Sequence, residues 1–265
     1  MSDVPVGVGK EILYEKSGAH IGIVTLNRPD KRNAVNAALT QAFQYLVALT
    51  ESDPDIRVVV LATSNDKAFC AGADLAEVAE GGAAALMPKD GGFAGFVHAK
   101  RRKPWIAAIR GAALAGGCEL ALACDLIVAS DETKFGLPEV KRGLFAAAGG
   151  VYRLPRALPR AIALELIVTG DTINAQRAYD LGLINRKVPL NQVDKTALAL
   201  ATTITENAPC SVIESLAVAR LAPEMSDAAL RELSDSSFAR ISATEDSREG
   251  PRAFVEKRAP VWKGC

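Results

Sequence analysis

The sequence contains only two histidines, His20 and His98, and neither lies at metal-ligand spacing from a cluster of cysteine, aspartate or glutamate. A histidine-based metal site and a Ser-His-Asp hydrolase therefore have no support. No G-x-G-x-x-G motif follows a predicted strand, so we expect no nicotinamide cofactor. These absences remove metal-dependent and dinucleotide-dependent chemistry from the expected functions.

An excess of charge of either sign is also lacking. Lys plus Arg and Asp plus Glu each total 31, which leaves no net charge to attract a polyanion. Residues 100–103 (KRRK) form one basic cluster before Pro104, but such a cluster typically ends a helix in solvent. We therefore expect no nucleic-acid partner.

Long apolar runs and paired cysteines are missing as well. No run approaches the roughly 18–20 residues that cross a bilayer, and the N-terminus has neither an apolar signal segment nor an Arg-rich amphipathic one. The five cysteines are odd in number and lack C-x-x-C spacing, which fits neither a disulfide framework nor a zinc site. The expectation is a cytoplasmic protein with reduced cysteines, no membrane partner and no bound metal.

Apolar residues, in contrast, make up 49% of the 265 positions and can fill a large core. Continuous β-branched runs predict buried strands at 21–27, 56–63, 105–111 and 126–130, with a short strand near 184–189. Apolar residues at helical spacing predict helices at 36–51, 118–125, 159–170 and 173–183, and helical sequence from about residue 190 onward. This alternation predicts an α/β architecture.

The same pattern divides the chain into two parts. Residues 1–200 carry recurring strand–strand–helix units, whereas residues 201–265 form a helical region with little strand. Between residues 75 and 103, two pairs of glycines and Pro88 interrupt the helical pattern. This interruption predicts short helices around a mobile insert that shapes a substrate pocket.

Two loops of small residues each follow a predicted buried strand. The first is residues 69–74 (FCAGAD), and the second is residues 113–119 (ALAGGCE), which opens a helix. Small side chains let a ligand approach the backbone N–H groups, and a helix N-terminus favours negative charge. One such loop would indicate only a tight turn. Two together favour an oxyanion site, in which each fixed donor typically contributes about 3 kcal/mol.

Two glutamates, Glu119 and Glu139, stand next to these features. Glu119 lies in the first turn of the helix that follows the second loop, and Glu139 lies in the turn GLPE (136–139). Burial in apolar surroundings raises carboxyl pKa values, and such a pair suits general acid–base catalysis. From the residues alone, dipole compensation by Glu119 and a surface ion pair of Glu139 remain open as the commoner roles.

Four motifs, in their order and spacing, resemble the enoyl-CoA hydratase/isomerase (crotonase) superfamily: FCAGADL (69–75), AALAGGCELALACD (112–125), KFGLPEVKRGL (134–144) and AGGVYRLPR (148–156). TLNRPDKRNAV (25–35) and EGPRAFVEKRAP (249–260) match as well, so the resemblance covers nearly the whole chain. It implies a spiral of ββα units and a C-terminal helical region used in trimerisation, commonly within a dimer of trimers.

The resemblance also implies the chemistry. It identifies the backbone N–H groups of Ala73 and Gly116 as the oxyanion hole, Glu119 as the group that helps to activate water, and Glu139 as the proton donor to C2. The implied enzyme is an enoyl-CoA hydratase, a hydro-lyase of fatty-acid degradation that adds water syn to a 2-enoyl-CoA and gives a 3-hydroxyacyl-CoA. Because both glutamates are present, this activity is favoured over decarboxylase, dehalogenase or hydrolase activity.

Contacts with coenzyme A follow from the same resemblance. The residues implied are Lys31 and Arg32 at the adenine and phosphate end, Ala71, Asp74 and Leu75 around the first loop, and Phe254 and Lys257, which match positions that approach the coenzyme A of a neighbouring subunit. Solvated turn residues are an equal alternative for the two cations. The coenzyme A is part of the substrate, so no separate cofactor is implied.

The chain departs from the family's residue pattern at one position of the pocket, and three other functions remain as alternatives. Many hydratases have a smaller residue where this chain has Phe145, which we expect to reshape the acyl pocket. Ala147 replaces the aspartate of the dienoyl isomerase branch, which counts against that activity. The alternatives are an enoyl-CoA isomerase, a specialised dehydratase of the carnitinyl-CoA type, and a non-catalytic protein that binds coenzyme A esters or RNA.

Overall fold

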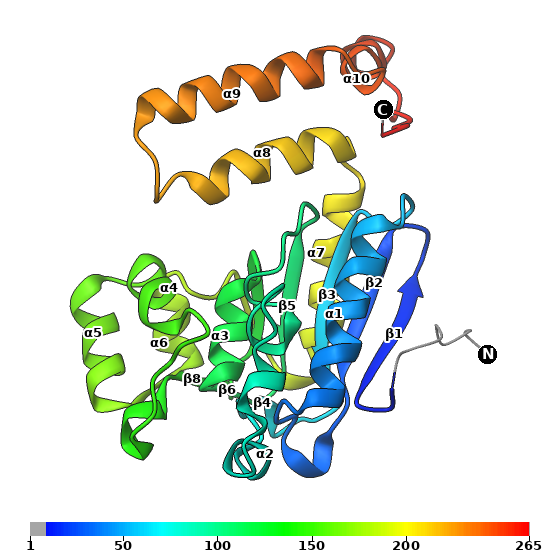
Figure 1. The fold of residues 1–265 in the computed structure, drawn as a ribbon. Helices are drawn as coiled ribbons and strands as arrows, with labels where there is room; N and C mark the ends of the chain where they lie inside the picture. Colours follow the sequence, from blue (N-terminus) through cyan, green and yellow to red (C-terminus); the bar gives the residue numbers. More distant parts are fainter. Residues whose placement is uncertain (1–8, 265) are drawn as a thin grey trace.

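Six strands form the larger of two sheets in a computed structural model that describes residues 9–264 (Figure 1). They are β1 (Ile12–Ser17), β2 (Ile21–Leu26), β3 (Val58–Thr63), β5 (Trp105–Ile109), β7 (Leu126–Ser130) and β10 (Arg186–Val188), which pair in the order β1-β2-β3-β5-β7-β10. Only the pairing of β1 with β2 is antiparallel. The strands predicted from the continuous apolar runs are confirmed, because β3 and β5 are buried along their whole length.

Four strands of three residues each form the smaller sheet. They are β4 (Ala68–Cys70), β6 (Ala112–Leu114), β8 (Lys134–Gly136) and β9 (Thr172–Asn174), in the order β4-β6-β8-β9. The sequence analysis did not predict them, because segments this short have too few residues for a periodic pattern.

Successive units of the chain place one strand in each sheet and then form a helix. The pairs β3-β4, β5-β6 and β7-β8 lead to α2 (Leu75–Ala79), α3 (Gly116–Ala123) and α4 (Gly150–Ala157) respectively. This arrangement is the mixed α/β fold of repeated ββα units that the resemblance implied. The helix expected at 118–125 starts two residues earlier, at Gly116, so that both glycines of the second loop belong to its first turn.

Local capping explains where the other helices of the core begin and end. In α1 (Ala37–Ser52), the Asn36 side chain accepts a hydrogen bond from the Leu39 N–H at 2.9 Å. Helix α5 (Arg160–Thr169) ends at Gly170, whose φ of +66° suits glycine, and α6 (Ala175–Asp180) follows. The 3₁₀ helices are η1 (Pro29–Lys31), η2 (Gly82–Leu86), η3 (Phe93–Gly95), η4 (Pro138–Arg142) and η5 (Leu190–Gln192).

The large sheet separates two apolar clusters. Along β3, Val59 and Leu61 belong to the main core, while Val58 and Val60 face a smaller cluster on the opposite side. Helix α7 (Val193–Thr205) covers that second side with Val193, Ala197 and Ala201, which share one helix face at intervals of four residues. Both faces of the sheet are therefore covered, which explains its continuous apolar strands.

Three helices follow the core: α8 (Pro209–Leu221), α9 (Asp227–Ser242) and α10 (Asp246–Val255). Figure 1 shows α8 and α9 side by side beyond one end of the sheets, with α9 farther from the core. Helix α8 has no fully buried residue, and α9 buries only Ser237. The predicted division at residue 200 falls inside α7 and stays a prediction, whereas the change in packing occurs between α7 and α8.

Three further expectations concern the N-terminal segment, the cysteines and the lack of a membrane-spanning helix. Residues 1–8, the first part of the N-terminal segment in which no signal was expected, and Cys265 lie outside the described residues. Cys70, Cys118 and Cys124 are unbridged thiols. Across residues 9–264, no helix has both the length and the apolar character needed to cross a membrane.

Gly117 tests the close packing of α3 against β4. A Cβ atom at this position would lie 2.0 Å from the carbonyl oxygen of Cys70, so Gly117→Ala has to displace backbone. We expect it to lower the free energy of unfolding by about 2–3 kcal/mol, as overpacking commonly does. Urea denaturation measures the loss. In the control Gly250→Ala, the added Cβ meets only the Trp262 ring at 3.3 Å, and we expect a change within about 1 kcal/mol.

Candidate active site

A pocket of about 490 Å³ opens where the loops after β4 and β6 meet. Its apolar wall comes largely from the interrupted segment after the first loop, through Leu75, Val78, Ala83, Leu86, Met87 and Phe93. The expectation that this segment shapes a pocket is confirmed. Its predicted mobility stays a prediction.

The two Gly/Ala loops touch each other directly. A Cβ atom on Gly72, whose φ is +97°, would lie 2.9 Å from the Ala115 Cβ and 3.1 Å from the Gly116 nitrogen. Glycine is therefore required at position 72 both for its backbone conformation and for the approach of the second loop. The contact brings Ala73 and Gly116, which are distant in sequence, into the lining of one pocket.

Two backbone N–H groups in this lining are available to a ligand. The bridge between Val35 and Ala73 uses the N–H of Val35, which donates to Gly72 O at 2.8 Å, and that of Asp74, which donates to Val35 O at 2.8 Å. The Ala73 N–H is thereby turned away from Val35. Gly116 is the first residue of α3, where an N–H has no partner within the helix.

Backbone strain stands directly beside the second donor. Ala115 has a φ of +52° and a ψ of −129°, a conformation that L-residues with a Cβ rarely adopt. Such residues typically cost about 1–3 kcal/mol and persist where surrounding structure holds them. The Ala115 N–H donates to Gly136 O of β8 at 3.0 Å, which ties the strained residue to the small sheet. The backbone conformation of Ala115 sets the direction of the Gly116 N–H, because its ψ angle orients the peptide group that the two residues share.

Glu119 is a buried carboxyl group on the first turn of α3, only 3% exposed. Its Oε1 accepts a hydrogen bond from the Gly150 N–H at 2.8 Å. Burial raises the pKa of Glu119 to about 7, against the lowering effect of the Gly150 hydrogen bond, and the neighbouring Glu139 raises it further. The side chain is therefore partly protonated near neutral pH.

Glu139 reaches the same pocket from η4. Its Oε2 is buried and has no hydrogen-bond partner among the described residues. Burial raises the pKa of Glu139 as well. Burial disfavours the ionised form of both carboxyl groups, and the charge of Glu139 further disfavours that of Glu119, so the two groups suit proton transfer.

The structure brings together most of the residues that were predicted as site residues. Those that line the pocket are Ala73, Gly116, Glu119, Glu139, Arg32, Ala71 and Leu75. Glu139 is half-buried and forms no ion pair among the described residues, so the surface ion pair that remained open for it is wrong. Glu119 lies in the first turn of α3, where dipole compensation and a place in the pocket are compatible. Phe145 also lines the pocket, at 70% exposure, as the departure from the family pattern led us to expect.

Four predicted residues lie outside this lining. The Asp74 carboxylate pairs with Arg28 at 3.1 Å and caps α2 by accepting from the Ala76 N–H at 3.3 Å, so its side chain supports the loop. Lys31 is exposed at the end of η1. Phe254, at 85% exposure, and Lys257 lie at the end of α10, and their approach to a neighbouring subunit stays a prediction.

Two features of the pocket were missed by sequence reasoning. The Gly150 N–H, which holds Glu119, lies 31 residues farther along the chain and gives no local signal. Arg142 also lines the pocket, as an exposed residue at the end of η4. It lies on the same side as Glu139, because residues three apart on a 3₁₀ helix lie one above the other.

Comparison with known proteins gives consistent matches over nearly the whole chain. A family model described as enoyl-CoA hydratase/isomerase matches residues 16–265. A probable enoyl-CoA hydratase of Mycobacterium tuberculosis is 41% identical over 95% of this chain and 97% of its own. A carnitinyl-CoA dehydratase of Proteus mirabilis is 40% identical over 91% of this chain and 94% of its own. The crystal structure of an enoyl-CoA hydratase from Mycobacterium tuberculosis H37Rv superposes with a TM-score of 0.92 at 39% identity, covering 97% of this chain and all of the other.

The raised pKa of Glu119 predicts how stability depends on pH. The folded carboxyl ionises near pH 7 and an unfolded one near 4.5, so the folded state holds the extra proton between these values. Stability contributed by this proton is lost as the pH rises from about 4.5 to about 7. Glu119→Gln, which keeps an acceptor for Gly150, should therefore exceed the wild type by about 3 kcal/mol at alkaline pH.

Urea denaturation of both proteins across this pH range measures the effect. We expect the advantage of Glu119→Gln to shrink towards zero below pH 4.5, where the wild-type carboxyl is protonated in both states. The exposed Glu165→Gln serves as the matched control and should show no such pH dependence. A Glu119→Gln advantage that stayed constant with pH would contradict the ionisation account.

Proposed function

The chain belongs to the enoyl-CoA hydratase/isomerase family, and we propose that it adds water across the 2,3 double bond of a 2-enoyl-CoA thioester to give a 3-hydroxyacyl-CoA. The observation that carries this proposal is the convergence on one apolar pocket of the buried Glu119, the half-buried Glu139 and two N–H donors that have no partner among the described residues. A role in fatty-acid degradation is part of the proposal.

The N–H groups of Ala73 and Gly116 bind the thioester oxygen in the proposed reaction. As a water oxygen bonds to C3, negative charge moves onto that oxygen, and the two donors stabilise the enolate more than the ground state. The peptide dipoles of α3 add a positive potential at the same place. Fixed backbone donors need no rearrangement as the charge develops.

The two glutamates divide the proton transfers between them. The ionised Glu119 accepts a proton from the attacking water, and the protonated Glu139 gives its proton to C2 of the enolate. The product has gained one water, and exchange of protons with solvent restores the pair. The raised pKa values of both groups support a role in proton transfer, because each carboxyl group keeps its proton to higher pH than it would in water.

A dehydratase of the carnitinyl-CoA type is the second candidate, since relatives with that name are 40% identical to this chain. A dehydratase eliminates water, which is the reverse of hydration. The same two glutamates serve both directions, so they do not distinguish the two activities. The charge of the lining does not distinguish them either, because Arg32 and Arg142 are matched in number by Glu119 and Glu139. Turnover of crotonyl-CoA against carnitinyl-CoA separates the two candidates. Products from a 3-enoyl-CoA would identify an isomerase.

Coenzyme A enters as part of the substrate, and the proposed reaction needs no metal or redox cofactor. Arg32, in the pocket lining, is the side chain we propose for its phosphates, and Lys31 on the adjacent surface adds positive charge. Phe254 and Lys257 are proposed to reach the coenzyme A bound to a neighbouring subunit. A cytoplasmic location is also proposed, supported by the unbridged thiols of the core.

We propose in addition that the C-terminal helices assemble the protein as a homotrimer or a dimer of trimers. Their apolar side chains are strongly exposed within one chain: Phe238, Phe254, Val255 and Val261. Helices with this much uncovered apolar surface are typical of subunit interfaces.

Substitution of either glutamate tests the reaction. We expect Glu119→Gln and Glu139→Gln each to lower kcat for hydration of crotonyl-CoA by about 10²–10⁴-fold, because each removes one proton transfer. The decrease in ultraviolet absorbance of the conjugated thioester measures turnover, and calorimetric binding of a saturated acyl-CoA checks that the pocket is intact. Glu165→Gln is the control. Near-normal hydration by either active-site variant would refute the two-glutamate mechanism.

Charge placed on α9 tests the assembly. Phe238→Asp puts a carboxylate where an apolar contact is proposed, and sedimentation velocity should show a shift from trimer or hexamer towards monomer. Val168→Asp, at an equally exposed apolar position on α5, should leave the assembly unchanged. An identical sedimentation profile for Phe238→Asp and wild type would place the interface elsewhere.

A further inference from the structure

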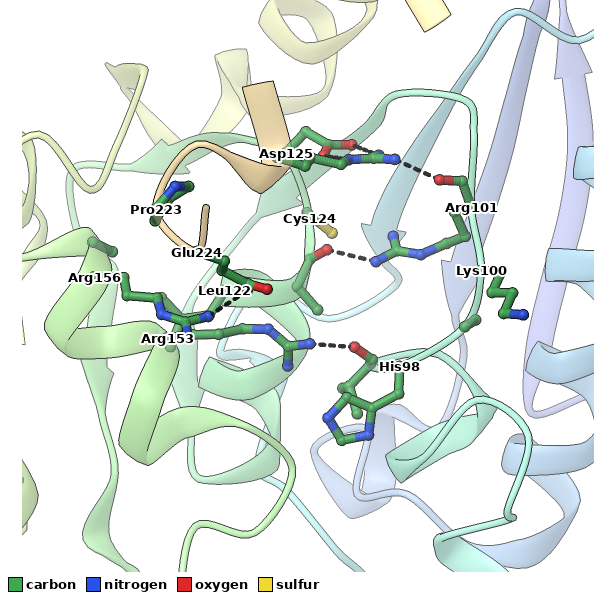
Figure 2. A pocket seen from close by; sticks show the side chains of 15 residues that line it. His98, Lys100, Arg101, Leu122, Cys124, Asp125, Arg153, Arg156, Pro223 and Glu224 are labelled. Atoms are coloured by element: carbon green, nitrogen blue, oxygen red, sulfur yellow. Dashed lines mark hydrogen bonds and ion pairs between the residues drawn. The ribbon is translucent and has the colours of Figure 1, made fainter. Parts of the chain in front are cut away.

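A second pocket, of about 640 Å³, lies at the other end of α3 (Figure 2). It is bounded by residues 97–101, the last turn of α3 with the residues that follow it, α4, and the turn after α8. None of its lining residues lines the pocket that holds the glutamates. Core and C-terminal helical region thus share a pocket that the proposed hydration does not use.

Positive charge predominates in this lining. The cations are Lys100, Arg101, Arg153, Arg156 and Arg220, and the carboxylates are Asp125 and Glu224. Both carboxylates are already engaged: Asp125 pairs with Arg220 at 2.7 Å, and Glu224 pairs with Arg156 at 2.7 Å. Figure 2 shows the second of these pairs, between α4 and the turn after α8. The other three cations keep no carboxylate partner within the pocket.

Arg101 is the least satisfied of these three. Its Nη2 donates to Ala123 O at 2.6 Å, but its Nε and Nη1 are buried and have no acceptor among the described residues. The guanidinium lies 3.9 Å from the centre of the Phe96 ring, which stabilises the cation but accepts no hydrogen bond from either nitrogen. Burial lowers the pKa of Arg101. A buried cation with free donors is costly unless an anion pairs with it.

Arg153 adds positive charge from the α4 side. Its Nη2 donates to Val97 O at 2.6 Å and its Nη1 to Ala148 O at 2.9 Å, so neutral carbonyl groups orient it without cancelling its charge. Figure 2 shows the guanidinium groups of Arg101 and Arg153 reaching the pocket from different elements. Two guanidinium groups in one cavity, one of them with two buried nitrogens, favour an anionic occupant.

We propose that this pocket binds a small oxyanion, a phosphate or carboxylate group, through the unpartnered donors of Arg101 and the positive charge of Arg153 and Lys100. The ligand stabilises the docking of α8 on the core, because Arg220 of α8 and the following turn form part of the same wall. The inference rests on this cavity alone and is independent of the hydratase reaction.

Calorimetric titration with inorganic phosphate and, separately, with citrate tests the proposal on the full-length protein, at ionic strength held constant with sodium chloride. Wild type should bind at least one of them saturably and show a raised Tm. Binding of phosphate alone assigns a phosphate group, and binding of citrate alone assigns a carboxylate. Arg101→Gln should weaken binding about tenfold or more, because charge-assisted hydrogen bonds are lost.

Two further variants keep the test decisive if Arg101→Gln folds poorly. Glu224→Gln, at a largely exposed pair, removes a negative charge and frees Arg156, so it should tighten binding about threefold. Arg32→Gln alters the other pocket and should leave binding unchanged. The site is overturned by an absence of saturable binding in wild type, by equal affinity in Glu224→Gln and wild type, or by loss of binding in Arg32→Gln.

Discussion

The contact between the two glycine loops is the constraint on which the proposed chemistry depends. Gly72 leaves room for Ala115 and Gly116, and Gly117 lies so close to Cys70 that no Cβ fits between them. These approaches place two donors from segments more than forty residues apart on one pocket wall. Because the donors are backbone groups that follow two neighbouring strands of the small sheet, β4 and β6, their direction is set by the fold and not by a side-chain rotamer.

Burial raises the pKa values of the two carboxyl groups in the same pocket. Glu119 sits on the helix whose first N–H faces the pocket, and Glu139 approaches from a separate turn, so the charges meet in an apolar space. Desolvation raises both pKa values, and the Gly150 N–H limits the rise for Glu119. A site that lacked this hydrogen bond would keep Glu119 protonated to higher pH and less able to accept a proton from water.

Charge is distributed differently at the two ends of α3. At the first end, the carboxyl groups of Glu119 and Glu139 are matched by Arg32 and Arg142, and the proposed chemistry uses backbone donors. At the other end, arginines predominate, and the ion pairs formed by Arg220 and Arg156 fasten the C-terminal helices to the core. Helices α8 and α9 bury few side chains within one chain. The C-terminal helical region therefore contains the proposed assembly surface, and it also forms one wall of the arginine-rich pocket.

The sequence by itself determined the α/β class, the long strands, helix α1 and the end of α5 at Gly170, because apolar periodicity and the choice of glycine at a helix end are local properties. The motif resemblance also singled out both glutamates and both donors. Only the tertiary structure decided that the three-residue strands form a second sheet, that Gly150 holds Glu119 and that two nitrogens of Arg101 are buried without an acceptor among the described residues. These features depend on contacts between residues far apart in the chain, and no local pattern records such contacts.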